Sequence, residues 1–278
     1  VVDNDPKATA REAVGALVAE SPCPLLYVHE PKPGVATARN AALQATDAPL
    51  IAFLDDDEAA EPHWLSALIA GQVETGADVV FGPIRGRVPE GTGWTTAYLE
   101  RFFGRQGPAE TGLIHHAYGC GNSLMVRAIA LPGSAPFDTA ADQSGGEDDA
   151  LFSALEARGG RFGWAADAWV DEFAPPHRAT LTYALARAFA YGQSPPQIAH
   201  RAGKPASVVF WMAVGVAQTL VWGAASLGLM LIASPKRAET LDRAARGLGK
   251  VLWMEGLEPH FYGARELARL DRVSPSAA

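Results

Sequence analysis

The sequence predicts an α/β protein with a mainly parallel sheet, followed by a C-terminal region of membrane-associated helices. Three observations lead to this class. Short apolar runs alternate with helical patterns through the first 81 residues, a cluster of carboxylates follows one buried strand, and one later stretch is long and apolar enough to reach a membrane. Strands joined by helices become parallel neighbours, because each helix carries the chain back to the same edge of the sheet.

The alternation is regular up to residue 81. Residues 1–3 read as the end of a strand, so we expect the first strand of the domain to precede this sequence. Further strands are expected at residues 25–28, 50–54 and 79–81, and helices at residues 8–19, 35–45 and 61–74. Beyond residue 81 the pattern is looser. There we expect helices at residues 94–103, 147–158 and 180–191, and strands at residues 122–126, 162–164 and 168–170. We predict one α/β domain over residues 1–200.

Residues 201–278 form a second region, organised around the apolar segment 206–233. Its few polar side chains are Ser207, Gln218, Thr219 and Ser226. A spanning helix needs about 20 apolar residues, so this segment predicts membrane association, as a span, an in-plane helix or a hairpin. A hairpin would bend at Gly215, Gly223 or Gly228. A helix buried against an oligomer partner is the alternative.

Charge is unevenly distributed over the chain. The net charge is −8, with ten Lys/Arg against six Asp/Glu in residues 201–278 and 13 against 25 in residues 1–200. An acidic body makes nucleic acid an improbable partner. The basic region includes a predicted amphipathic helix whose apolar face holds Leu241, Ala245, Leu248 and Leu252, which suits anionic lipid. Cys23 and Cys120 are too few for a disulfide framework and favour a reducing compartment.

The carboxylates Asp55, Asp56, Asp57 and Glu58 directly follow the apolar run 50–54. Like charges repel, and burying them unpaired is costly, so the cluster is either solvated or holds a cation. Open α/β sheets bind ligands at the carboxyl ends of their strands, which favours the cation over an acidic surface turn. We expect Glu58 to face solvent or to begin the next helix, where an acid complements the helix dipole.

Five motifs occur in one order along residues 1–195. They are Val2-Asp3-Asn4-Asp5, the stretch from Gly34 to Leu43, Phe53 to Glu58 with Pro62 and Trp64, Gly119-Cys120-Gly121-Asn122-Ser123, and Gly145-Gly146-Glu147-Asp148. With them the chain resembles the family 2 glycosyltransferases, which have the Rossmann-like GT-A fold of nucleotide-diphospho-sugar transferases. Gly82-Pro83-Ile84-Arg85 and Ser144 to Asp148 resemble most closely the bacterial succinoglycan-type exopolysaccharide glucosyltransferases.

The resemblance implies how a donor is bound. Asp55-Asp56-Asp57 matches the DXD motif, so Asp57 is the expected ligand of Mn²⁺ or Mg²⁺, together with Asp55. Asp55 or Asp56 would reach the ribose of a nucleotide sugar, most simply a UDP-sugar. Asp3 and Asn4 would contact the uracil ring. Arg39 would meet the diphosphate; a surface ion pair is its other interpretation.

The resemblance also implies how an acceptor is activated. Asp148 would be the general base that removes the acceptor proton, and Glu147 would bind the acceptor beside it. Capping of a helix N-terminus is the structural alternative for both acids. Gly121 and Asn122 would line the acceptor side, and His177 is a candidate for the metal or the diphosphate from a loop.

The implied function is inverting transfer of glucose from UDP-glucose to an undecaprenyl-diphosphate-linked oligosaccharide at the cytoplasmic face of the inner membrane. Processive members of the family carry a Gln-x-x-Arg-Trp motif, which this sequence lacks, so we expect one sugar to be added per acceptor. The alternatives are a nucleotidyltransferase and an inactive membrane-bound protein that binds sugar or serves as a scaffold.

Overall fold

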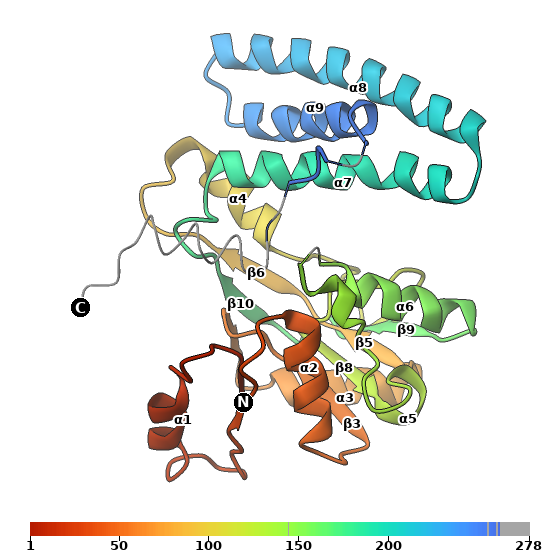
Figure 1. The fold of residues 1–278 in the computed structure, drawn as a ribbon. Helices are drawn as coiled ribbons and strands as arrows, with labels where there is room; N and C mark the ends of the chain where they lie inside the picture. Colours follow the sequence, from red (N-terminus) through yellow and green to blue (C-terminus); the bar gives the residue numbers. More distant parts are fainter. Residues whose placement is uncertain (144, 255, 260, 262–278) are drawn as a thin grey trace.

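The computed structural model describes residues 1–143, 145–254, 256–259 and 261, and it confirms the α/β class (Figure 1). The strands and helices of the transferase-like part surround a central sheet, and three long C-terminal helices lie to one side of it (Figure 1). The end of the predicted basic tail, residues 262–278, lies outside the described residues.

The central sheet has five strands in the order β3-β8-β5-β9-β7. Their bounds are β3 Leu50–Phe53, β5 Val79–Phe81, β7 Gly112–Ile114, β8 Ser123–Val126 and β9 Phe162–Trp164. β5 and β9 are parallel, but β8 runs antiparallel between β3 and β5, and β7 is antiparallel to β9. The prediction of a mainly parallel sheet is therefore wrong, and the sheet is mixed. Between β5 and β8 the chain forms β6, α4 and β7, and α4 packs against β6 and α7, so this connection is not a simple strand-helix-strand crossover.

The register of β8 decides where two of the sequence motifs meet in space. Ser123 pairs with Phe53 on one side and with Phe81 on the other. The segment that follows Phe53 and the segment that precedes Ser123 therefore leave the sheet at the same edge. The acidic cluster at residues 55–58 and the glycine-rich stretch at residues 119–122 become neighbours in this way.

Helices cover this sheet and complete its core. They are α2 Val35–Gln44, α3 Trp64–Thr75, α5 Arg127–Ala130 and α6 Glu147–Ala157. Phe81 lies at the centre of the core, with Phe152 edge-on at 5.3 Å between ring centroids, and Phe53 meets Phe137 in the same way at 5.9 Å. Such aromatic pairs add about 0.5–1.5 kcal/mol beyond their buried area. Cys120 is buried in this core.

Two smaller sheets flank the central one. β1 Val2–Asp3 pairs in parallel with β2 Val28–His29, and α1 Arg11–Leu17 lies between them in the chain. A second sheet has the order β4-β10-β6, with bounds Glu58–Ala60, Val170–Phe173 and Ile84–Arg87. The strands β4 and β6 were not expected, because neither has the apolar alternation that identifies a strand in sequence.

The C-terminal helices are α7 Leu181–Arg201, α8 Pro205–Leu231 and α9 Arg237–Val251, with α9 between the other two (Figure 1). They meet α4 Thr96–Phe103, which follows the short 3₁₀ turn Gly93–Thr95; a second such turn is Thr139–Gln143. α8 is continuous, so the alternative of a hairpin bending at its glycines is wrong. Gly215 instead packs against α9, where a Cβ would lie 2.7 Å from the carbonyl oxygen of Gly247.

α8 is the one helix, among the described residues, that is long and apolar enough to cross a membrane. It has 27 residues, a mean hydropathy of 1.7 in its most apolar window, and only 11% of that window is buried. A core helix of a soluble protein would be mostly buried, and this helix is not.

Candidate active site

The site lies at the sheet edge where β3 ends and β8 begins. α2 brings Arg39 to this edge, the segment after β3 brings residues 55–58, and the N-terminus of α6 brings Glu147 and Asp148. These contacts join four of the five motifs found in the sequence, and a hydrogen bond from Asn4 to Gly34 joins the fifth.

The N-terminus of α2 is held by a distant carboxylate. Asp142 accepts hydrogen bonds from the backbone nitrogen of Thr37 at 3.2 Å and from its hydroxyl at 2.6 Å. Gly34, with a φ of 150°, makes room, because a Cβ there would lie 2.2 Å from the Asp142 carboxyl carbon. Asn40 exchanges two hydrogen bonds with the backbone of Phe137. The stretch from Gly34 to Leu43 therefore fixes the segment that leads into α6.

Arg39 connects the two acidic parts of the site. Its Nη1 donates to Oε1 of Glu147 at 2.5 Å, and its Nη2 lies 3.7 Å from Oδ1 of Asp55. The side chains of Arg39 and Glu147 are 12% and 8% exposed, so this pair is largely withdrawn from water. The ion pair that was the other interpretation of Arg39 is therefore present, but its closest partner, Glu147, is buried and not at the surface. Burial raises the pKa of Glu147 and the neighbouring Asp148 adds to the effect, while Arg39 opposes it.

Asp148 is held by backbone groups on both sides. Its Oδ2 accepts from the backbone nitrogen of Cys120 at 3.1 Å, and its Oδ1 accepts from the backbone nitrogen of Asp149 at 2.9 Å. The first bond reaches the glycine-rich segment and the second lies within the first turn of α6. Asp148 is half-exposed, so it can meet a substrate hydroxyl while these bonds fix its position.

The four acids of residues 55–58 differ in their exposure, and Glu58 does not lie where the sequence predicted. Asp56 is exposed, Asp55 and Asp57 are half-buried, and Glu58 turns back so that its Oε2 accepts from the backbone nitrogen of Asp55 at 2.9 Å. The prediction that Glu58 faces solvent or begins a helix is wrong, because Glu58 is half-buried and begins β4. Burial raises the pKa of Glu58 to about 7. Burial also raises the pKa of Asp57, together with the charges of Asp56 and Asp55.

Two residues of this site were missed in the sequence. Glu172 on β10 pairs with Glu58 across the β4–β10 ladder, and burial with the charge of Asp57 raises the pKa of Glu172 to about 8. Arg105 donates to the carbonyl oxygens of Gly121 at 2.9 Å and Gly119 at 3.0 Å. Its half-buried guanidinium thus fixes the glycine-rich segment beside the acids. Both residues stand outside any motif, and only the strand pairing brings them to the site.

Gly121 and Asn122 have different surroundings. Gly121 lets the acids approach, since a Cβ there would lie 2.6 Å from Oδ2 of Asp55 and 3.2 Å from Oε1 of Glu58. Asn122 is fully buried with a φ of 47°, and its amide donates to the carbonyl oxygens of Pro83 and Ala168 and accepts from the indole of Trp64. This arrangement makes Asn122 a structural residue that ties three segments together, in place of the predicted contact with an acceptor.

Asp3 and Asn4 lie at the end of β1. Asp3 is buried and accepts hydrogen bonds from the hydroxyl of Tyr27 at 2.8 Å and from the backbone nitrogens of Asp5 and Ala10. Burial acts to raise its pKa, but these bonds, led by Tyr27, outweigh burial and lower it. Asn4 donates to the carbonyl oxygen of Gly34 at 3.0 Å, which joins the N-terminal segment to the start of α2.

The acidic cluster fits a divalent cation by its chemistry. Asp55 and Asp57 offer hard carboxylate oxygens. Burial and then repulsion by Asp56 and Asp55 raise the pKa of Asp57, and a bound cation would relieve that repulsion. Within the described part of the chain, no three His, Cys, Asp or Glu side chains form a ready-made metal site, so His177 does not complete one with these acids. His177 is exposed in the turn after β10. Mg²⁺ needs only one or two carboxylates when substrate phosphates supply the remaining ligands.

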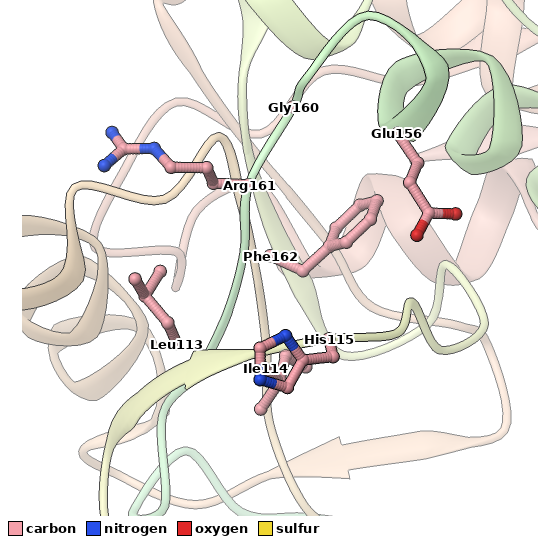
Figure 2. A pocket seen from close by; sticks show the side chains of 7 residues that line it. All are labelled: Leu113, Ile114, His115, Glu156, Gly160, Arg161 and Phe162. Carbon is pink, nitrogen blue, oxygen red and sulfur yellow. The ribbon is translucent and has the colours of Figure 1, made fainter.

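A separate pocket of about 240 Å³ lies at the edge of the central sheet between β7, β9 and α6 (Figure 2). Its polar lining residues are His115, Glu156 and Arg161. Figure 2 shows these side chains around the strand that carries Phe162. The guanidinium of Arg161 is bound to the carbonyl oxygen of Gly76 at the end of α3. The pocket shares no residue with the site described above.

Comparison with known proteins gives three results. Residues 1–131 match the family model described as "Glycosyl transferase family 2". The chain is 31% identical, over 96% of its length and 86% of the relative's, to the "Succinoglycan biosynthesis protein ExoM" of Rhizobium meliloti (strain 1021). A crystal structure of GalNAc-T7 with UDP, GalNAc and Mn²⁺ aligns at a TM-score of 0.46 and 14% identity, covering 70% of this chain and 44% of that one.

The relative and the family model agree with the resemblance seen in the five motifs. The chain is a glycosyltransferase of family 2, with the GT-A fold.

Proposed function

We propose that this protein is an inverting, metal-dependent, non-processive glycosyltransferase. It transfers a sugar, in the simplest case glucose from UDP-glucose, to a lipid-linked oligosaccharide during synthesis of an exopolysaccharide. The observation that carries the proposal is the contact network in which Arg39 meets both Glu147 and Asp55. This network brings together the guanidinium of Arg39, the acidic cluster that we propose as the metal site, and the acidic pair Glu147 and Asp148.

The donor side consists of residues 55–57 and Arg39. A bound Mn²⁺ or Mg²⁺ would stabilise charge on the departing diphosphate, with Asp57 and Asp55 as its protein ligands. Arg39 is buried, charged and fork-shaped, which suits a diphosphate oxygen once the donor displaces water from the site. Asp56 is exposed and available to a ribose hydroxyl. Asn4 is the better candidate of the predicted pair for uracil, because the carboxylate of Asp3 already accepts three hydrogen bonds.

The acceptor side consists of Asp148 and Glu147. Asp148 takes the proton of the attacking hydroxyl as that oxygen bonds to the anomeric carbon and the diphosphate leaves from the opposite face. The bonds from Cys120 and Asp149 hold the carboxylate ready for this step. Glu147, fixed by Arg39, orients a second acceptor hydroxyl. His177 remains a candidate for contact with the diphosphate from the turn after β10.

Similarity to the succinoglycan biosynthesis protein and the exposure of α8 support a proposal for the acceptor and for the location in the cell. The relative is named for succinoglycan biosynthesis, which supports a role in building an exopolysaccharide. A lipid-linked acceptor, such as an undecaprenyl-diphosphate oligosaccharide, stays at the membrane, and the exposed apolar α8 would bring the enzyme to it. Because nucleotide sugars are cytosolic, we place the catalytic part at the cytoplasmic face of the inner membrane.

We further propose two regions with different tasks. Residues 1–200 act as the transferase domain, and residues 201–278 act in membrane association. α7 ends the first region and packs against α9, so it joins the two.

The test is a panel of radiolabelled nucleotide sugars, incubated with the purified protein, Mn²⁺ and a bacterial lipid extract. We expect label from one UDP-sugar to enter the lipid fraction, with the anomeric configuration of the product inverted by NMR. Binding of a donor without transfer to any acceptor would contradict the proposal and favour an inactive sugar-binding protein. Formation of nucleoside triphosphate and sugar 1-phosphate from the nucleotide sugar and added pyrophosphate would favour a nucleotidyltransferase.

A further inference from the structure

α8 presents one continuous apolar face to the outside of the molecule. Its exposed residues, all of which the structure describes, recur at spacings of one and three as far as residue 228 and are all apolar. We call this face the apolar stripe; its largest members are Val209, Phe210, Val216, Leu220, Val221, Leu227, Met230 and Leu231. Isolated exposed apolar residues are common, but a stripe that follows a helix for 27 residues marks a contact surface.

The few polar side chains of α8 lie on the opposite face of the helix, and α9 covers this face. Gln218 accepts a hydrogen bond from Nζ of Lys250 at 3.1 Å, and Thr219 lies against Gly247. Ser226 is buried, 2% exposed. The two helices approach so closely that a Cβ on Gly247 would lie 2.7 Å from the backbone nitrogen of Thr219. α8 therefore cannot move without α9.

α9 is too charged to enter the hydrocarbon of a bilayer. It carries Arg237, Glu239, Asp242, Arg243, Arg246 and Lys250. Two of these bind α4: Glu239 pairs with Arg101, and Asp242 accepts from the hydroxyl of Tyr98. A spanning α8 would carry this partner into the membrane or expose its own polar face to lipid, and either is costly. With the apolar stripe immersed and α9 on the water side, both costs are avoided.

The charges around the apolar stripe indicate what covers it. Residues 201–251 contain seven Lys/Arg and only two Asp/Glu, so this region is positively charged. Arg201, Lys204 and Lys236 lie exposed at the two ends of α8, and the guanidinium of Arg243 lies 4.3 Å from the ring centre of Trp222. A second copy of this chain would bring the same cations together across the interface. Anionic lipid headgroups complement them.

We infer that α8 lies flat in the surface of an anionic bilayer, with the apolar stripe immersed and α9 held above it in the headgroup layer. This deepens the membrane association proposed above and rests on it. It excludes α8 as a transmembrane span, and it makes α8 and α9 a platform that holds the transferase domain at the membrane surface.

Vesicle binding tests the surface. The full chain should sediment with phosphatidylglycerol-containing vesicles and far less with pure phosphatidylcholine vesicles. Leu220→Glu and Leu227→Glu should each weaken binding about tenfold or more, because each removes a large immersed side chain and adds an anion. Val73→Glu on α3, a residue 74% exposed and far in sequence from α8, is the matched control and should bind as the parent does. Equal binding by all variants would overturn the inference.

Immersion depth tests the orientation. Spin labels at positions 209, 220 and 231, introduced singly in a Cys23→Ser background, all lie on the exposed side of α8. These positions span about 33 Å of helix. A flat helix predicts similar shallow depths at all three. A depth maximum at position 220 with aqueous ends would show a span, and contact between labels of two copies without lipid exposure would show a dimer; either result overturns the inference. No donor is present in these measurements, so failure of sugar transfer leaves their outcome unaffected.

Discussion

Arg39 and Glu147 form a hydrogen-bonded ion pair at 2.5 Å, although they lie 108 positions apart in the chain. The pair joins α2 to the first turn of α6 and is nearly closed to water. It sets the distance between the proposed donor side and the proposed acceptor side. A buried pair of this kind is sensitive to the loss of either partner, because the remaining charge is left uncompensated.

We expect Arg39→Lys to lower kcat/KM by about 10²-fold while the protein remains folded. Lysine keeps the charge but cannot reach Glu147, Asp55 and a diphosphate with one planar group. Steady-state kinetics with the donor that the nucleotide-sugar panel identifies would measure the change. Arg158→Lys, an exposed arginine at the end of α6, is the control and should be neutral. Full activity in Arg39→Lys would show that the fork geometry is unimportant.

Asn122→Ala should destabilise the fold. The change leaves two buried carbonyl oxygens and an indole N–H without their partner, and each such group costs roughly 1–3 kcal/mol. A fall in Tm of several degrees is therefore expected in thermal unfolding. Ser66→Ala, which removes an exposed hydrogen bond to His63, should change Tm little. An unchanged Tm with a raised KM for the acceptor would contradict the structural role and would support a contact between Asn122 and the acceptor.

Stability at acid pH should depend on Asp3. Its pKa is lowered in the folded protein, because hydrogen bonds from Tyr27 and two backbone nitrogens outweigh burial. Its ionised form therefore stabilises the fold above the unfolded pKa of about 3.9, and that contribution is lost as the pH falls through the lower folded pKa. The difference in unfolding free energy between the parent and Asp3→Asn should be constant above pH ~5 and shrink below pH ~4. A difference that does not change with pH would contradict this account.

Donor binding should require a divalent cation and Asp57. We expect EDTA to abolish binding of the nucleotide sugar in calorimetry and Mn²⁺ to restore it in the parent. Mn²⁺ should not restore it in Asp57→Ala. Burial and the charges of Asp56 and Asp55 raise the pKa of Asp57, so the substitution removes a repelling charge and should not lower Tm. Asp47→Ala, at an exposed position, is the control. Donor binding in EDTA would contradict the metal role.

The elements with strong local signals were predicted from the sequence. β5 and β9 have the expected bounds, and α2 and α6 lie within one residue of theirs, because each has a clear apolar pattern. α7 continues ten residues past its expected end, through Pro195 and Pro196, because packing against α9 overrides the local cost of the prolines. The antiparallel insertion of β8 depends on long-range pairing that no local pattern records.

The site was predicted as far as its motifs extend. The contact of Arg39 with Glu147 is consistent with the grouping that the motif order implied, although the catalytic roles stay predictions. Glu172, Arg105 and Asp142 were not found, because each acts through a partner that only the fold brings close. Gly247 and Gly249 are poor helix formers, yet they allow the close packing of α9 against α8 and α7. From the local sequence alone, a glycine at a contact between two helices cannot be distinguished from a glycine in a loop.

The central claim is that Asp148 is the base that activates the acceptor, and Asp148→Asn tests it most directly. Asparagine can keep the hydrogen bond from the backbone nitrogen of Cys120 but cannot take a proton. We predict that kcat falls by about 10²–10⁴-fold. The Kd for the donor with Mn²⁺ should stay within about twofold of the parent's, and the Tm within about two degrees. Asp149→Asn, the exposed neighbour on α6, should retain activity. Sugar transfer by Asp148→Asn at the rate of the parent would contradict the assignment.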